Sequence, residues 1–162
     1  MIMTDVKVPP RVQGLDLRSG ALRIVAPKQG AYPGIAEHLR QALTRATGAD
    51  VSILGDGVSP DDIPGGTVVA LGNLMDSAFV RRLYLAWFDW TDAAWPGPGG
   101  WTLRTIVDPW GKGGDILLVG GSDEGGTGVA AQALIRRIER DGTALPILHE
   151  VQMGAWAGEY RR

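Results

Sequence analysis

Short apolar segments along the chain predict five β-strands. Residues 22–26 (LRIVA) and 51–54 (VSIL) are apolar runs too short for a stable helix. Residues 67–71 (TVVAL) are nearly all apolar, which is typical of a strand covered on both faces. Residues 101–107 (WTLRTIV) alternate between apolar and polar positions, and residues 116–119 (ILLV) predict a second fully buried strand.

Two longer segments have the spacing of amphipathic helices. In residues 33–47 an apolar side chain recurs every three or four positions. Pro33 suits the first turn of this helix, and Gly48 suits the left-handed residue just after its end. Apolar positions with the same spacing line residues 129–138, and Gly142 is expected to end that second helix.

A third, shorter helix is expected between the strands at 67–71 and 101–107. Asp76 or Ser77 could cap its N-terminus, because both side chains accept hydrogen bonds from backbone N–H groups. Phe79, Leu83 and Trp87 would then share one face, which we expect to pack against the sheet.

The order of these elements predicts an α/β (α+β) fold. We expect a single mixed β-sheet of about five strands with the two main helices on one face. The domain is predicted to span residues 22–151, with residues 144–151 as a final strand or an extended segment. Residues 1–21 are predicted to be a flexible arm, because Pro9 and Pro10 oppose regular structure, and residues 152–162 a tail or linker to a following domain.

Composition fits one globular domain and argues against several classes of protein. The chain has 162 residues, of which 44% are hydrophobic and 21% charged. Its net charge of −2 and its interspersed acids and bases leave no basic stripe for nucleic acid. No apolar run approaches the roughly 20 residues that span a bilayer. The absence of cysteine and the presence of only 2 histidines argue against a metal site.

A glycine-rich turn at residues 120–128 is the clearest candidate for a phosphate-binding element. It follows a strand and opens a helix, where unpartnered backbone N–H groups attract anions. Gly126, Gly128 and Ala131 fit the G-x-G-x-x-A form of the dinucleotide fingerprint. Glu150 lies about 20 residues further on, near the position of a ribose-binding acid.

Other features of this turn favour a structural role. The fingerprint glycine should follow the strand directly, whereas Gly126 comes well after it. Asp123 and Glu124 would repel a pyrophosphate, and no second half of a nucleotide-binding fold follows in this chain. We therefore expect the glycines to allow close packing, with Ser122, Asp123 or Thr127 as the helix cap, and we expect no cofactor.

Five of the six tryptophans lie in one stretch of the chain. Trp87 and Trp101 occupy apolar faces of predicted elements and are expected in the core. Trp90, Trp95 and Trp110 fall in predicted loops, where they could form a platform for a sugar ring or a contact with a neighbouring domain.

The chain offers no evident catalytic constellation. A glycosidase needs two carboxyl groups at a controlled separation, one of them with a raised pKa. The acids near the predicted loops are more typical of turns than of catalysis. They are Asp89, Asp92, Asp108, Asp115, Asp123 and Glu124. His38 and His149 lack the nearby serine and acid of a triad, so we expect no catalytic residue.

Several short motifs together resemble one known accessory module. They are the strand at 22–26, a helix ending in Ala46-Thr47-Gly48, the segment VALG at 69–72 and the turn at 120–128. In this order they are similar to the small α/β domain that precedes the catalytic barrel in family 20 β-N-acetylhexosaminidases and α-glucuronidases. The tryptophan-rich insert at 84–110 departs from that pattern and looks more like the version in large bacterial polysaccharide-degrading proteins.

The resemblance implies a non-catalytic role. In such enzymes the acid–base pair belongs to a barrel of about 250 residues, which this chain cannot contain. We expect an accessory domain of a multidomain glycoside hydrolase or polysaccharide lyase, packed against the catalytic domain of the same parent protein. Such a parent would be periplasmic or extracellular. The alternatives are a carbohydrate-binding module that uses Trp90, Trp95 and Trp110 and, less favoured, a nucleotide-binding domain that uses residues 120–128.

Overall fold

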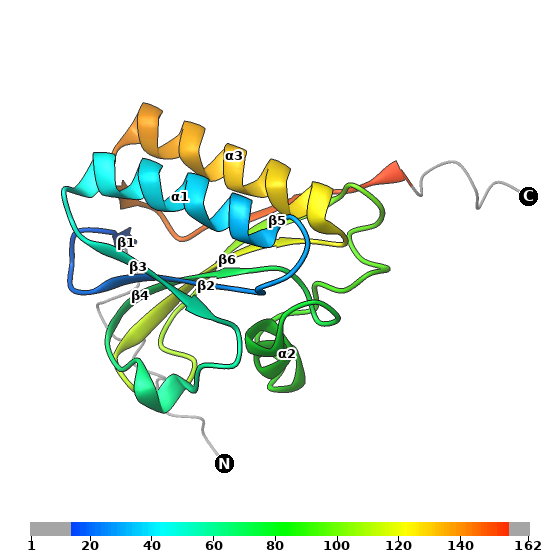
Figure 1. The fold of residues 1–162 in the computed structure, drawn as a ribbon, viewed down its shortest axis with the longest axis horizontal. Helices are drawn as coiled ribbons and strands as arrows, with labels where there is room; N and C mark the ends of the chain where they lie inside the picture. The colour runs from blue at the N-terminus through cyan, green and yellow to red at the C-terminus, as the bar shows by residue number, and fades with distance from the viewer. Residues whose placement is uncertain (1–13, 156–162) are drawn as a thin grey trace, which may run out of the picture.

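A six-stranded mixed sheet forms the centre of the molecule in the computed structural model, which describes residues 14–155 (Figure 1). The strand order is β3-β2-β4-β6-β5-β8. Strands β3, β2, β4 and β6 are parallel, and β5 runs antiparallel to both of its neighbours. The strands are β2 (Leu22–Ala26), β3 (Val51–Gly55), β4 (Gly66–Leu71), β5 (Trp101–Ile106), β6 (Gly114–Gly121) and β8 (His149–Gln152).

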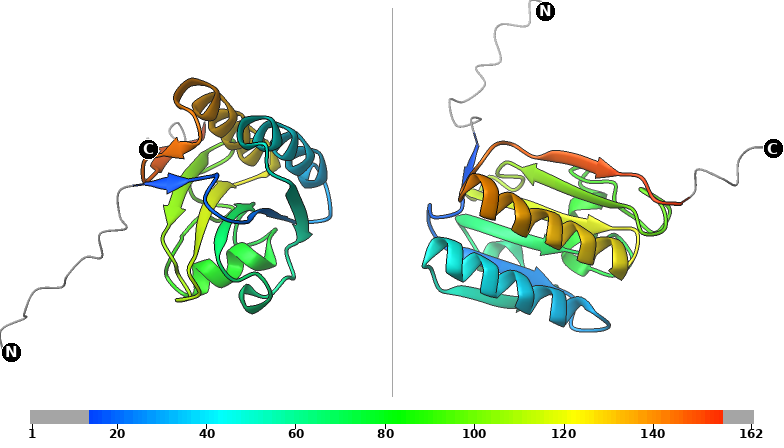
Figure 2. Two further views of the ribbon diagram at one scale, coloured as in Figure 1. Left: turned by 90° about the vertical axis from the view of Figure 1, so that its left-hand side faces the viewer. Right: turned by 90° about the horizontal axis from the view of Figure 1, so that it is seen from above.

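Helices cover both faces of this sheet. The two long helices, α1 (Tyr32–Thr47) and α3 (Glu124–Asp141), run side by side over one face (Figure 2). The shorter α2 (Ala78–Leu85) lies on the opposite face, as does the 3₁₀ turn η1 (Pro60–Asp62), whose neighbour Ile63 is buried there. The prediction of an α/β (α+β) domain with the two main helices on one face is confirmed, with six strands in the sheet instead of about five.

The alternation of side chains along the central strands explains this three-layer arrangement. Leu117 of β6 packs under α1 and α3, whereas the next residue, Leu118, packs on the α2 side. Val69 and Ala70 of β4 divide between the two sides in the same way. Because successive side chains of a strand point to opposite faces, an apolar strand of this kind needs cover on both.

The last residues of the predicted arm belong to the domain instead. Strand β1 (Leu15–Asp16) pairs antiparallel with β7 (Ala144–Leu145), and Leu15 and Leu17 are buried. The prediction of a flexible arm over residues 1–21 is therefore corrected from residue 14 onward, and residues 1–13 lie outside the described part of the chain. Two residues are too few to show a strand pattern, and their partner lies far along the sequence.

The C-terminal segment continues the sheet, as one of the two predicted alternatives had it. Strand β8 pairs with β5 at the edge, with His149 opposite Arg104. After Gln152 the chain still contacts the domain, because Gly154 N donates to Pro96 O at 2.9 Å. Of the predicted tail at 152–162, residues 156–162 lie outside the described residues.

The prediction that Trp87 packs in the core is wrong. Helix α2 is capped by Ser77, as expected, but it ends at Leu85, and Trp87 is 90% exposed. Trp87 N donates to Tyr84 O and Phe88 N to Leu83 O, both at 3.0 Å, which is the hydrogen-bond pattern of a Schellman motif. This turn directs Trp87 to solvent and packs Phe88 against the core in its place. Trp101 is partly buried against the core, in line with expectation.

No helix within residues 14–155 combines the length and the apolar character needed to cross a membrane.

The start of α3 packs directly on the loop before β5. A Cβ atom at Gly126 would lie 2.3 Å from the carbonyl oxygen of Gly100, which is backbone and cannot turn away. At Gly128, two residues further along the same helix, the nearest atom would be 3.8 Å away on the side chain of Ile35. The close approach of α3 to Gly100 therefore requires glycine at position 126, whereas position 128 has room for a larger side chain.

We expect Gly126→Ala to lower the free energy of unfolding by roughly 1–3 kcal/mol, because the backbone must shift to relieve the clash. Gly128→Ala is the matched control and should raise stability by about 0.5–1 kcal/mol, since alanine favours the helix. Urea unfolding of both variants measures the difference. Equal effects of the two substitutions would contradict the proposed close contact.

Candidate functional site

The glycine-rich turn at 120–128 is closed by the protein's own carboxylates. Asp123 is the cap of α3: its Oδ1 accepts from Gly126 N at 2.7 Å and its Oδ2 from Gly99 N at 2.8 Å. Glu124 accepts from Ala31 N at 3.0 Å, at the start of the other long helix. Because the N-terminus of α3 already holds these two carboxylates, it is a poor site for a phosphate.

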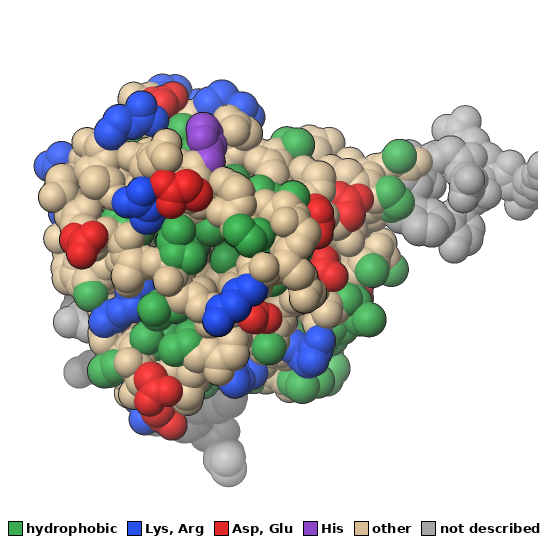
Figure 3. Space-filling view, viewed as in Figure 1, with side chains coloured by type: hydrophobic (Ala, Val, Ile, Leu, Met, Phe, Trp, Pro, Cys, Tyr) green, Lys and Arg blue, Asp and Glu red, His purple; other side chains and the backbone are tan. Residues whose placement is uncertain are grey.

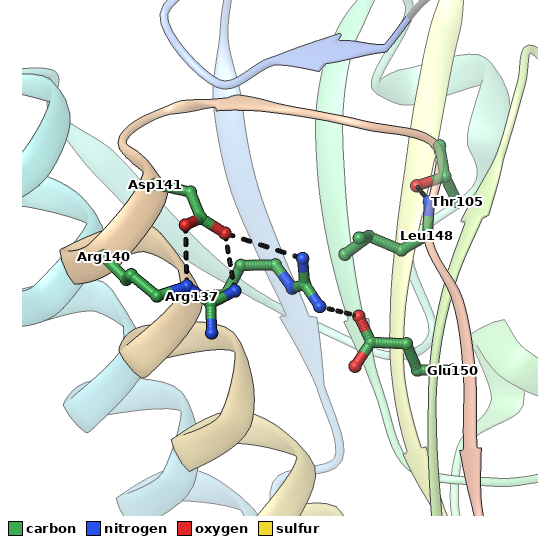
Figure 4. A network of polar contacts seen from close by, with 6 residues as sticks. All are labelled: Thr105, Arg137, Arg140, Asp141, Leu148 and Glu150. Carbon is green, nitrogen blue, oxygen red and sulfur yellow. Dashed lines mark hydrogen bonds and ion pairs between the residues drawn. The ribbon is translucent and has the colours of Figure 1, made fainter.

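Glu150, the candidate ribose-binding acid, lies at the wrong end of α3. It forms an ion pair with Arg137, whose guanidinium also lies 3.6 Å from Asp141 (Figure 4). Arg137 is thirteen residues after Glu124, which corresponds to about 20 Å along a helix. The network in Figure 4 joins the C-terminal end of α3 to β8, and it has a structural role.

The crevice at the carboxyl ends of the parallel strands is also filled. In open α/β sheets, ligands bind where the chain connections from adjacent strands diverge, which here lies between β2 and β4. Tyr32 occupies that position and donates to Asp76 Oδ2 at 2.7 Å. Asn73 donates to the same oxygen at 3.2 Å and to Gly121 O at 2.9 Å. Burial, followed by the contact with Asp76, raises the pKa of Tyr32.

The six acids near the predicted loops all accept hydrogen bonds from backbone N–H groups. These contacts are turn and cap interactions, which position the loops and occupy the oxygens that an acid–base pair would need. The acids are Asp89, Asp92, Asp108, Asp115, Asp123 and Glu124. Across residues 14–155, no three His, Cys, Asp or Glu side chains are grouped so that they could hold a metal ion.

The two helices on the outer face flank two hollows. One, near their N-terminal ends, is lined by Ile35, His38 and Gln132 among others. The other, near their C-terminal ends, has the apolar side chains of Ala42, Ala46, Ile135 and Ile138 in its lining. Arg18 reaches across it and donates to Ala46 O at 3.1 Å. On the face seen in Figure 3, Lys and Arg side chains are interspersed with Asp and Glu side chains. The hollow at the C-terminal ends of the helices is lined by the polar side chains of Arg45, Glu139 and Thr143 as well.

Of the three loop tryptophans, the structure brings two together. The rings of Trp90 and Trp95 are 6.0 Å apart at an angle of 58°. Trp90 remains 43% exposed, so much of its indole faces solvent. Trp110 does not join them: it packs edge-on against Phe79, with the ring centroids 5.4 Å apart, beside the core on the α2 side.

Arg104 and His149 complete the group around Trp90. The guanidinium carbon of Arg104, on β5, lies 3.7 Å from the centre of the Trp90 ring, close enough for a cation–π interaction. His149, the partner of Arg104 in the β5–β8 ladder, places its exposed ring 6.3 Å from that of Trp90. Trp90, Trp95, Arg104 and His149 form the Trp90 surface.

Asp89 supports this surface from below. It is only 3% exposed, and its oxygens accept from the backbone N–H of Thr91 at 2.9 Å and from its hydroxyl at 3.1 Å. Arg104 lies 3.8 Å away. Burial raises the pKa of Asp89, and the hydrogen bonds from Thr91 and the charge of Arg104 offset part of that shift.

Sequence reasoning found the two tryptophans but missed Arg104 and Asp89 as their partners. The alternation of WTLRTIV puts Arg104 at a polar position of the strand, so the sequence predicts a solvent-facing side chain with no fixed partner. In the structure Arg104 is largely buried, because the segment that carries Asp89 and Trp90 lies against it. That contact depends on how the 86–100 loop folds back, which no local pattern encodes.

Comparison with known proteins finds neither a family nor a curated relative that matches this chain. What the domain does must therefore be inferred from its own contacts, and the Trp90 surface and the exposed Trp87 are the features that its fold leaves unexplained.

We expect Asp89→Asn to change how stability depends on pH. The pKa of Asp89 in the folded protein lies above the ordinary value of about 4 that it has in the unfolded chain. At a pH between these two pKa values, the folded protein therefore binds more protons than the unfolded chain. The contribution of Asp89 therefore favours folding below pH 4 and is lost as the pH rises through the raised value. Relative to wild type, the variant should gain stability between pH 4 and pH 7.

Urea unfolding of both proteins at several pH values measures this difference. Val129→Ala supplies the control: it changes an exposed residue that has no titratable group, so its curve should stay parallel to that of wild type. Parallel curves for wild type and Asp89→Asn would show that the pKa of Asp89 is not raised.

Proposed function

We propose that this chain is a non-catalytic accessory domain of a multidomain carbohydrate-degrading enzyme of the glycoside hydrolase or polysaccharide lyase type. In this proposal the end of α2 packs against the catalytic domain of the same parent protein. The observation that carries it is the state of Trp87, whose indole is 90% exposed on a left-handed backbone.

Trp87 is an unfavourable residue for the isolated domain. It occupies the position of the Schellman motif at which glycine is usual, with φ of 63°. A non-glycine residue pays about 1–2 kcal/mol for this conformation. An indole that is almost fully solvated gains little from the rest of the domain in return. The cost is offset if another protein surface covers the ring, and strained residues of this kind often mark functional positions.

A second exposed apolar side chain lies close to Trp87 in the chain. Leu85, at the last position of α2, is 69% exposed. Tryptophan is enriched at protein interfaces, and large buried aromatics commonly dominate their binding energy. The end of α2 therefore has the chemistry of a contact with another folded domain.

The occupied carboxylates support the non-catalytic part of the proposal. Each of the six loop acids is engaged by backbone N–H groups, so catalytic use would require breaking a turn or a helix cap. The carbohydrate part rests on the resemblance of the strand, helix and turn motifs to the module that precedes a catalytic barrel.

Trp87→Gly should affect the isolated chain and the assembled protein in opposite directions. Removing the left-handed strain should stabilise the isolated chain by about 0.5–1 kcal/mol in urea unfolding. The same change should weaken binding to the separately produced catalytic domain by tenfold or more in calorimetric titration, as for an interface hot spot.

Val129 provides the control for that titration. It is 46% exposed on α3, on the opposite side of the sheet, so Val129→Ala should leave binding to the catalytic domain unchanged. Unchanged binding of the Trp87→Gly variant would overturn the proposed interface. A parent gene without a catalytic domain, or glycan turnover by this chain that an Asp→Asn change within it abolishes, would overturn the accessory role.

A further inference from the structure

We propose that the Trp90 surface binds an acidic sugar, with the carboxylate of a uronic acid residue on Arg104 and the pyranose ring on the exposed indole of Trp90. This proposal does not depend on the accessory role, because all of its residues lie within this chain and the site needs no second domain.

The first argument is that the guanidinium of Arg104 keeps its donors free for a ligand. Its side chain is only 18% exposed, and its distance to Asp89 is 3.8 Å, which is too long for a hydrogen bond. Among residues 14–155, the one fully buried side-chain nitrogen or oxygen without a partner is Thr44 Oγ1, so solvent reaches the nitrogens of Arg104. A guanidinium carries five N–H donors, and a ligand oxygen can take the place of that solvent.

Asp89 does not form a hydrogen bond with Arg104 at the 3.8 Å that separates them. Each of its oxygens already accepts one hydrogen bond from Thr91, in the turn that carries Trp90. Asp89 therefore balances the charge of Arg104 from a distance and leaves the donors of the guanidinium available. It acts as a positioning residue for the surface.

The geometry of the guanidinium selects the kind of ligand. Its planar fork matches the two oxygens of a carboxylate, with which it forms paired hydrogen bonds. Trp90 already covers one face of this fork at 3.7 Å, so a ligand oxygen must approach in the plane of the fork, along its edge. The exposed His149 ring lies beside the same indole and can donate or accept a further hydrogen bond.

The indoles supply the second half of the site. Trp90 is 43% exposed, and Trp95 stands at 58° to it, so the two rings form an angled apolar platform beside Arg104. The C–H bonds on one face of a pyranose ring pack well on such a surface, while its hydroxyls stay in water. A uronic acid residue combines that apolar face with a carboxylate in one unit.

Charge separates this ligand from a polyanion such as a nucleic acid. Within residues 14–155, Arg104 is the only arginine or lysine that lies over the Trp90 ring, and Asp89 offsets its charge. The whole chain carries a net charge of −2. A single carboxylate suits this balance, whereas a backbone of several phosphates would need more cations. We therefore expect modest affinity that depends on the sugar ring and its carboxylate together.

The test is a titration of the chain with oligosaccharides of galacturonate, mannuronate and glucuronate, followed by tryptophan fluorescence. The proposal predicts saturable binding of at least one of them. The methyl ester of the same oligosaccharide keeps the ring and removes the charge, so wild type should bind it at least tenfold more weakly. This comparison needs no variant and therefore does not depend on the folding of one.

Arg104→Lys keeps the positive charge and loses the fork, and it should weaken binding by about tenfold. Trp110→Phe is the control: Trp110 packs on Phe79, away from Trp90, so affinity should not change. Saturable binding by none of the three uronates would overturn the proposal, as would equal binding of the ester or full affinity in Arg104→Lys. Preference for a sulfated neutral sugar over every uronate would also overturn it. Trp87→Gly should still bind, which separates this site from the interface at the end of α2.

Discussion

The burial of β4 and β6 on both faces is the constraint from which the rest of the structure follows. These parallel strands are apolar at nearly every position, so each face must be covered. The crossover helices α1 and α3 cover one face. The other has only the eight residues of α2 and the short η1, so the long loop after α2 must fold back to complete the layer.

That shortage of helix determines where the unusual residues lie. Phe88, in the loop after α2, and Trp110, in the turn between β5 and β6, fill the layer beside α2. The loop after α2 leaves Trp87 and Trp90 outside that layer. The domain therefore has one regular face, covered by two long helices, and one irregular face built from turns. Binding surfaces are commonly carried on irregular segments held by a rigid scaffold. Both proposed contacts lie on the irregular face.

The regular part of the fold could be predicted from local sequence. The strands at 22–26, 67–71 and 116–119 are visible as apolar runs, and Pro33 and Gly48 mark the ends of α1. These features depend on residues close together in the chain. By contrast, the β1–β7 pair joins segments more than a hundred residues apart, and two residues per strand carry no periodic signal.

The site was predictable only in part, for a related reason. Tryptophans in a loop indicate a surface, but the sequence does not say which of them meet. Trp90 and Arg104 come together because the loop reverses onto β5, whereas Trp110 is drawn to Phe79. The position of Trp87 was mispredicted because helical spacing continues past Leu85 in the sequence, while the Schellman turn ends the helix there.

The double role of Asp123 has a consequence for how the loop before β5 moves. One oxygen caps α3 and the other holds Gly99 N, while Ser122 Oγ accepts from Gly97 N at 2.8 Å. The amides of this irregular loop are thus bonded to the first turn of a long helix. In hydrogen–deuterium exchange they should open together with the N-terminus of α3, as one cooperative unit, and not with the fast rates of a free loop. The scaffold beside Trp95 is accordingly as persistent as the helix that anchors it.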